Sequence, residues 1–205
     1  MTTTQPMPPP DTAPDGKAPP TAPTMAEALA ALARRFADPN DHGKCFDTGL
    51  VARLRRLPAG GPAGVDVWQA LYDGLGADQA DALLSGRSPD RVGAGWALIL
   101  HGMALMAPEP HRQGRRAGEA LAEAGFSEIR LTQLLRADAD GFPDHFATAC
   151  RFLRAKGEDV DWTEFGQLAL KRLGLSPGYE AAADRIARDY VRTLHRAAKQ
   201  PEAGA

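Results

Sequence analysis

Arginine side chains held at helical spacing are the groups in this sequence best suited to chemistry. In "EIRLTQLLRAD", residues 128–138, three leucines fall within one narrow arc of a helix, as in an amphipathic helix packed on a core: Leu131, Leu134 and Leu135. Arg130 and Arg136, with Gln133 between them, run along the side that faces away. A guanidinium group can form paired hydrogen bonds with a phosphate, but exposed arginines also keep a helix soluble. This stretch alone leaves both interpretations open.

Arginines recur in three further segments: "GLVARLRRL" with Arg53, Arg55 and Arg56; "RQGRR" (112–116) in a predicted loop; and "CRFLRAK" with Arg151, Arg154 and Lys156. The last predicted helix adds a basic stripe that spans an arc of about 80° at 100° per residue: Arg185, Arg188, Arg192, Arg196 and Lys199. Its apolar face consists of Tyr179, Ala183, Ile186, Tyr190 and Leu194. Because Asp184 and Asp189 can pair with the stripe, solvation explains it at least as well as phosphate binding.

Arginine greatly outnumbers lysine, with 19 against five. Arginine suits paired phosphate contacts, and lysine is the ordinary choice for solubility alone. A GC-rich genome produces the same excess, so composition supports phosphate binding only weakly.

No residues for covalent or metal catalysis stand out. The sequence has no G-x-S-x-G, Walker A or H-E-x-x-H motif, and "GAGWAL" lacks the preceding strand of a dinucleotide site. Cys45 and Cys150 form no C-x-x-C pair, and His42 with Cys45 gives too few ligands for an ion. We therefore expect no metal, no cofactor and no enzyme activity. Asp138 and Asp140 follow a helix, where forming a turn is the usual role of aspartate.

Length and charge limit the possible classes of protein. The 205 residues, 43% hydrophobic and 24% charged, are enough for one packed core. A formal net charge of −2 attracts no polyanion, so nucleic-acid binding would need local basic patches. The longest apolar run (92–107) contains His101 and is shorter than the roughly 20 residues of a membrane span, which predicts a buried helix with a hydrogen-bonded core histidine. Sparse cysteines and no visible signal peptide favour the cytoplasm.

Helix signals repeat along the chain, and no segment alternates with period two over a useful length. We therefore predict that residues 24–199 form an all-α bundle of nine or ten short helices, in one body or two packed lobes. Residues 1–23, rich in Pro, Thr and Ala, predict a disordered tail, and residues 200–205 a flexible C-terminus. The expected helix starts are Thr24 (with Glu27 as a capping box), Thr48, Asp66, Asp78, Ser88, Gly118, Ser127, Pro143, Asp161 (with Glu164 as a second capping box) and Ser176.

Several of these segments together resemble the CasB family, the small subunits of Cascade, the type I-E CRISPR surveillance complex. The most specific block is "GEALAEAGFSEIRLTQLLRAD" (118–138), followed by an arginine-containing helix, "DVDWTEF" and "ARDYV". Upstream, "GLVARLRRLP", "VWQALY" and "WALILHGMALMA" occur in the same order as in the family. The resemblance covers about residues 25–195.

The resemblance implies a non-catalytic all-α subunit, present as a pair of copies, that contacts the large subunit and the backbone subunits. It would help to hold the crRNA–target duplex and the displaced strand by their backbones, stabilising the R-loop in antiviral defence, because base pairing reads the sequence. The matching basic positions are Arg55, Arg56, Arg91, Arg130, Arg136 and Arg151, of which Arg91 is the loosest match. Phe126 replaces a basic residue of the family, and "ADADGFPDH" (137–145) is longer and more acidic than usual.

Two alternatives remain open at this stage. A helical adaptor would bind only protein through an apolar face, with its arginines merely solvating the helices. A hydrolase would use the acidic loop 138–144, and its activity would disappear in Asp138→Asn.

Overall fold

The computed structural model describes residues 23–37, 45–86 and 88–199, which form ten helices and no strand. The helices are α1 (Met25–Arg34), α2 (Thr48–Arg55), α3 (Val65–Leu75), α4 (Ala77–Leu84), α5 (Pro89–Met106), α6 (Ala117–Glu123), α7 (Glu128–Arg136), α8 (Phe142–Lys156), α9 (Trp162–Arg172) and α10 (Tyr179–Lys199). The all-α prediction is therefore confirmed. The predicted tail lies outside the described residues except for Pro23, as do His42 and residues 200–205.

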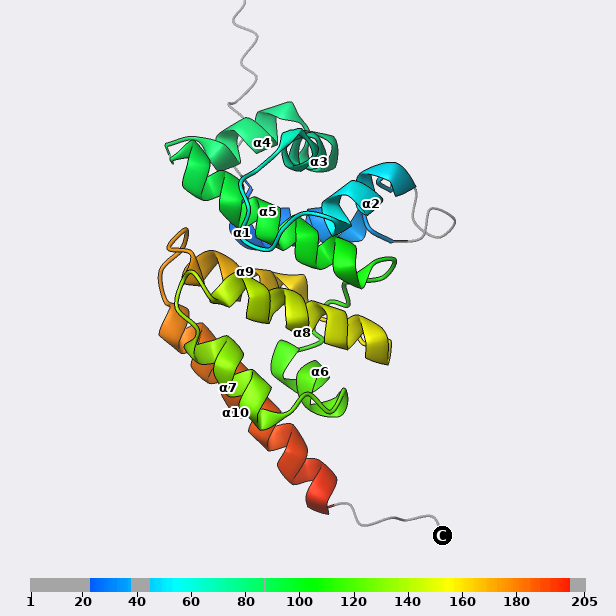
Figure 1. Ribbon diagram of the computed structural model, residues 1–205, viewed down its shortest axis with the longest axis vertical. Helices are drawn as coiled ribbons and strands as arrows, with labels where there is room; N and C mark the ends of the chain where they lie inside the picture. Colours follow the sequence, from blue (N-terminus) through cyan, green and yellow to red (C-terminus); the bar gives the residue numbers. More distant parts are fainter. Residues whose placement is uncertain (1–22, 38–44, 87, 200–205) are drawn as a thin grey trace, which may run out of the picture.

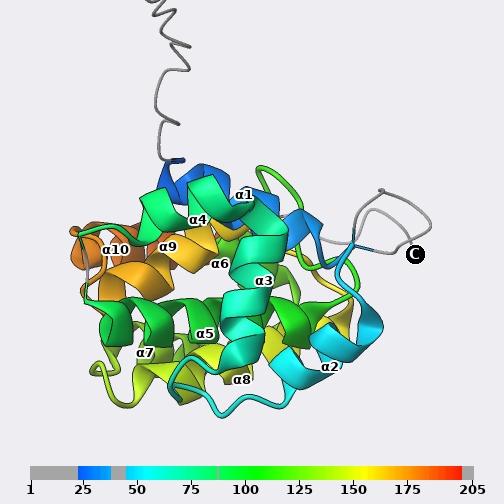
Figure 2. The same cartoon turned by 90° about the horizontal axis from the view of Figure 1, so that it is seen from above.

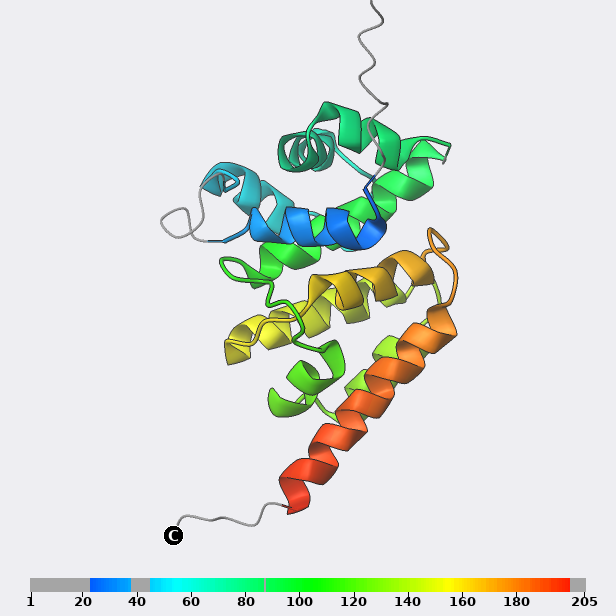
Figure 3. The ribbon, with the colours of Figure 1, turned by 180° about the vertical axis from the view of Figure 1, so that it is seen from behind.

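The helices form two stacked halves that share one core. Figure 1 shows α1–α5 in the upper half and α6–α10 in the lower half, and Figure 3 shows the same division from behind. Helix α5 packs on α8 and helix α1 packs on α9, so the two halves are joined along two pairs of helices. Buried side chains from both halves belong to one hydrophobic cluster, including Leu29, Trp96, Phe146 and Trp162.

Helix α5 is the central core helix, as the apolar run at 92–107 predicts. Trp96, Ile99 and Leu100 are fully buried, and no described helix is long and apolar enough to cross a bilayer. His101 is only 1% exposed, and its Nδ1 lies 3.0 Å from the backbone oxygen of Leu54. Because a carbonyl oxygen can only accept a hydrogen bond, the His101 Nδ1–H is the donor to the Leu54 carbonyl. The predicted core histidine is confirmed, and it ties α5 to α2.

Local capping motifs begin and end several helices where the sequence predicts. Thr24 Oγ1 accepts from the Glu27 backbone N–H at 3.2 Å, and the Glu27 carboxylate accepts from the Thr24 N–H at 2.8 Å, which completes the capping box. Ser127 Oγ accepts from the Arg130 N–H at 3.4 Å at the start of α7. Gly157, with φ of 72°, ends α8 in the left-handed region that favours glycine.

Other predicted helix starts are displaced by one to three residues. Gly64 and Gly76 are the N-caps of α3 and α4, so Asp66 and Asp78 lie inside the first turn instead of before it. An aspartate in the first turn is stabilised by the positive end of the helix dipole. Each aspartate therefore indicates the correct helix, but the N-cap lies two residues earlier. Helix α2 begins at Thr48 as predicted, with Asp47 as its N-cap. The remaining corrected starts are Ala117 for α6, Phe142 for α8 and Tyr179 for α10.

The second predicted capping box, at Asp161 and Glu164, does not form. Asp161 caps α9 by accepting from the Thr163 N–H at 2.9 Å, as expected. The Glu164 carboxylate accepts from the Ala117 N–H at 3.0 Å, and the Asp161 N–H donates to the Arg115 carbonyl at 2.7 Å. Glu164 therefore joins α9 to the first turn of α6, and a tertiary contact replaces the local one.

Helices α6 and α10 approach so closely that a glycine is required between them. A Cβ atom on Gly118 would lie 2.3 Å from the carbonyl oxygen of Ile186 and 2.9 Å from the backbone nitrogen of Tyr190. The Tyr190 hydroxyl also donates to the Phe126 carbonyl at 2.6 Å, just before α7 begins. These contacts fix the α6–α7 segment, and with it the arginines of α7, against α10.

Candidate nucleic-acid interface

Helix α7 presents its arginines from a firmly packed base. Leu131 and Leu134 are buried, Leu135 is half-buried, and Arg130 and Arg136 are exposed. The predicted division into a leucine face and an arginine face is therefore confirmed. The two arginines are about 9 Å apart along the helix axis, from a rise of 1.5 Å per residue.

An aromatic ring of α8 lies beneath the first of these arginines. The guanidinium of Arg130 is 5.9 Å from the ring centroid of Phe152, and the ammonium of Lys156 is also 5.9 Å from that centroid. The ring is half-buried and packs edge-on against Phe126, with centroids 5.2 Å apart. Cation–π contact orients both charges without neutralising them. Basic side chains from α7 and α8 thus lie next to one another.

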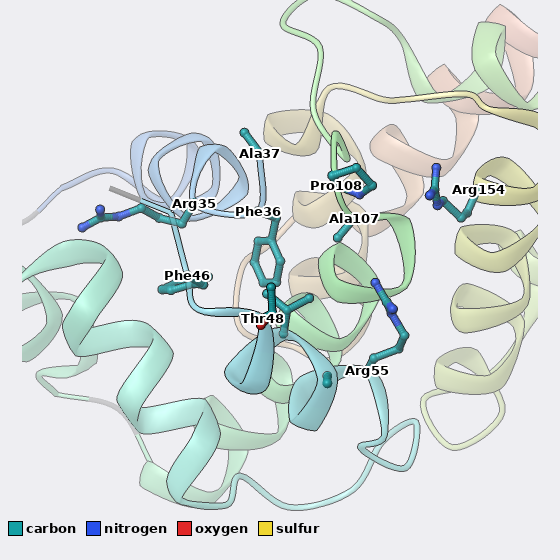
Figure 4. Close-up of a pocket in the computed structure, with 11 residues that line it drawn as sticks. Arg35, Phe36, Ala37, Phe46, Thr48, Arg55, Ala107, Pro108 and Arg154 are labelled. Atoms are coloured by element: carbon teal, nitrogen blue, oxygen red, sulfur yellow. The ribbon is translucent and has the colours of Figure 1, made fainter. Parts of the chain in front are cut away.

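A second junction brings α8 next to the end of α2. Arg55 donates from Nε to the Ala104 carbonyl at 2.9 Å, near the end of α5, and its side chain lines a pocket together with Arg154 of α8. Figure 4 shows these two arginines on the same side of that pocket. Arg56, the C-cap of α2, and Arg151, one turn before Arg154, are exposed.

We call the surface formed by these side chains the basic face: Arg55, Arg56, Arg130, Arg151, Arg154 and Lys156. Helices α2, α7 and α8 lie on the same side of the molecule in Figures 1 and 2, opposite α1 and α10. None of the six forms an ion pair with a described residue. The basic face is therefore positively charged and not neutralised by the part of the chain that the structure describes.

Two of the predicted site residues lie away from this group. Arg91 is in the first turn of α5, 13 residues before Ala104, so about 20 Å of helix separates it from the carbonyl that Arg55 contacts. Arg136 is the last residue of α7 and extends the basic face toward the loop before α8. The structure thus brings together Arg55, Arg56, Arg130 and Arg151, whereas Arg91 lies at the opposite end of α5.

The arginines of "RQGRR" serve the fold. Arg115 is 15% exposed and contacts the carboxylates of Glu123 at 2.6 Å and Glu158 at 2.8 Å, and these hydrogen bonds raise its pKa. Arg116 lies 2.9 Å from the carboxylate of Asp189, which is buried between α6 and α10. Arg112 also contacts Asp159 at 2.9 Å, so all three arginines of this segment are paired with carboxylates that hold the loop before α6.

The basic stripe belongs to α10, a helix that faces the viewer when the molecule is seen from behind in Figure 3. Arg192 contacts Asp189 and lies 3.6 Å from Glu119, and Arg188 lies 3.9 Å from Asp184. The prediction that acidic residues pair with this stripe is confirmed for these two arginines. Leu194 departs from the predicted apolar face, because it is 42% exposed near the end of the helix.

The described residues contain no cluster of His, Cys, Asp and Glu that could hold a metal ion. Cys150 is a buried thiol, and burial raises its pKa. Asp138 accepts from the Gly141 N–H at 2.8 Å, so it forms the turn that the sequence predicts.

The fold and this surface define a small all-α protein that carries a basic face on one side. The family model for CRISPR-associated protein Cse2 matches residues 50–190, and the chain belongs to this family. No curated protein and no solved structure matches the chain. The predicted membership of the CasB family, the small subunits of type I-E Cascade, is confirmed. The protein is therefore a structural subunit of that complex. The matched range includes every residue of the basic face.

Proposed function

We propose that this subunit holds the backbones of the crRNA–target duplex and the displaced strand through its basic face, without sequence preference, and so stabilises the R-loop in antiviral defence. The observation that carries the proposal is the set of six basic side chains on α2, α7 and α8 with no ion-pair partner among the described residues. Contacts to phosphates position a nucleic acid but carry no sequence information. That property suits a complex in which base pairing reads the target.

The spacing of the basic face fits a phosphate chain. Arg151 and Arg154 are about 4.5 Å apart along α8, and one strand of B-DNA carries a phosphate about every 3.4 Å along the axis. Their helix is anchored by Leu153 and Cys150, both fully buried. The helix that carries these arginines is therefore held in place, and their exposed guanidinium groups can reach the phosphates of a strand of any sequence.

The proposed setting is the cytoplasm, where crRNA and invading DNA meet. We propose that the subunit is not an enzyme and needs no cofactor, and that its protein partners are the large subunit, the backbone subunits and a second copy of itself. These partners follow from the family and not from any surface described above.

The salt dependence of binding tests the proposal. Fluorescence anisotropy with a labelled single-stranded oligonucleotide should show tight binding by the full chain at low salt. With four to six phosphates engaged, the slope of log affinity against log salt should be about −3 to −4 for a single strand and about −4 to −5 for a duplex. Affinity that does not change with salt, or no binding at low salt, would overturn the proposal.

A matched pair of variants locates the binding surface. Arg151→Ala should make the slope for a single strand less steep by about 0.7 and should weaken binding of all sequences equally. Arg196→Ala removes another exposed arginine, from α10 on the opposite side, and should leave binding unchanged. Equal effects of the two variants would mean that overall charge, and not the basic face, attracts the nucleic acid.

A protein-only adaptor remains the second candidate, and one observation favours it. Val191 and Leu194 are 49% and 42% exposed on α10, so an apolar strip is available to a protein partner. If Cascade reconstituted with arginine variants of the basic face retains full target binding, the adaptor function is correct.

A further inference from the structure

The pocket beside the basic face has an apolar interior and an arginine rim. It has a volume of about 340 Å³ and lies where the ends of α1, α2 and α5 meet α8. Phe36 and Phe46, whose rings pack edge-on with centroids 5.0 Å apart, form its floor, and Ala107 and Pro108 form one wall. Figure 4 shows Phe36 at the centre, between Ala107 and Thr48.

The charged residues known to line the pocket are all basic. They are Arg35, Arg55 and Arg154, and none of the described residues that line it is acidic. Arg35 also donates to the Asp73 carbonyl at 2.7 Å, which holds it at the edge. A ligand that suits this pocket has an apolar ring for the interior and a negative charge for the rim. A nucleotide combines the two, because each base is joined through its sugar to a phosphate.

We propose that this pocket accepts one unstacked base from a single strand whose phosphates contact Arg55 and Arg154. The inference rests on the proposed function, because those arginines belong to the basic face. A volume near the lower end of the range of about 300–1,000 Å³ for ligand pockets suits one planar ring system and not a larger ligand. Guanidinium planes also stack on bases, so the rim contributes to holding the ring.

The pocket composition agrees with binding that ignores sequence. Most of its interior is apolar, from Val51, Ala52 and Ala107 and the rings of Phe36 and Phe46, and Thr48 supplies the one uncharged hydroxyl among the described lining residues. Apolar and stacking contacts accept any base, because every base has a π face. The bases of an intact duplex are stacked and paired, so the pocket selects single strands or unpaired nucleotides.

Two oligonucleotides test the proposal with the full chain. A single strand and the same strand with abasic sites throughout carry identical phosphates. Loss of the buried base should weaken binding about five- to 150-fold, from typical values for one base held by stacking. The fluorescence of 2-aminopurine in the intact strand should rise on binding, because the base leaves its stacked neighbours. Equal affinity of the two strands with no rise in fluorescence would overturn the proposal while leaving the phosphate contacts intact.

A pocket-filling variant and a control locate the effect. Ala52→Phe places a ring inside the pocket and should remove the preference for the intact strand over the abasic one. Ala181→Phe adds the same ring at an exposed position of α10 and should preserve the preference. Thermal denaturation checks that both variants fold. If Ala52→Phe does not fold, Thr48→Phe supplies the second test, because Thr48 is exposed and lines the same pocket, so a ring there should also remove the preference.

Two other results would overturn the base-pocket proposal. If the unmodified chain binds no oligonucleotide even at low salt, both the proposed function and the base pocket are wrong. If Ala52→Phe binds oligonucleotides with the normal preference but no longer enters Cascade, the pocket holds a side chain of a protein partner and the base proposal is wrong.

Discussion

Acidification should destabilise this protein through His101, a buried residue next to the basic face. Burial lowers the pKa of His101 below its usual 6.5, and the nearby charge of Arg151 lowers it further. Nδ1 donates to the Leu54 carbonyl, and Nε2 has no hydrogen-bond partner among the described residues. Protonation would therefore place a charge without a partner in the core. Since Leu54 directly precedes Arg55, the same ring also holds the end of α2 that presents this arginine.

The sign and size of the effect follow from proton linkage. Below pH 6.5 the unfolded chain binds a proton at His101 that the folded chain does not bind, so the free energy of unfolding falls as the pH falls. The loss is about 1.4 kcal/mol per pH unit between 6.5 and the folded pKa. Full stability is present above pH 6.5. Between pH 7.5 and pH 5.5, His101 should cost at most about 1.4 kcal/mol.

Urea denaturation at pH 7.5 and pH 5.5 measures this loss, with His101→Gln as the comparison. Glutamine does not titrate, and its amide N–H can still donate to the Leu54 carbonyl. The variant should lose less stability on acidification than the unmodified chain, by up to about 1.4 kcal/mol. His111, whose pKa burial also lowers, contributes equally to both proteins and cancels. Identical losses in the two proteins would refute a neutral, buried His101.

Two further variants test the packing that positions the basic side chains. Gly118→Ala should destabilise the fold by about 1–3 kcal/mol in thermal denaturation, because the added Cβ meets the Ile186 carbonyl at 2.3 Å; unchanged stability would show that α6 can move away from α10. Arg136→Ala should change stability by less than about 0.5 kcal/mol, as an exposed substitution, whereas Arg130→Ala should cost about 0.5–1 kcal/mol through its contact with Phe152. Equal stabilities would mean that the ring contact contributes nothing.

The elements that the sequence predicts well are those specified by neighbouring residues. The capping box of Thr24 and Glu27 needs only residues three apart, and the same is true of the Ser127 cap of α7. Glu164 carries the same local signal, but its carboxylate binds the backbone of Ala117, 47 positions earlier in the chain. Local rules hold until a distant segment offers the carboxylate a better-placed donor.

The same distinction applies to the candidate site. Helical periodicity alone places Arg130 and Arg136 on the exposed side of α7, because the leucines must be buried. It cannot show that Arg154 shares a pocket with Arg55, since α2 and α8 are almost 100 residues apart and meet only in the fold. Arg91 rests on a loose match to the family, and the structure places it at the far end of α5.

The distribution of charge explains how a chain with a formal net charge of −2 can present a phosphate-binding surface. Acidic residues pair with the arginines that serve the fold: Glu123 and Glu158 contact Arg115, and Asp189 contacts Arg116. The basic face has no such partners among the described residues. At physiological salt, charges beyond about 8 Å are largely screened, so a bound phosphate responds to the nearest arginines and hardly to the total charge. Pairing acidic residues with the arginines that serve the fold therefore leaves the six side chains of the basic face available to a strand.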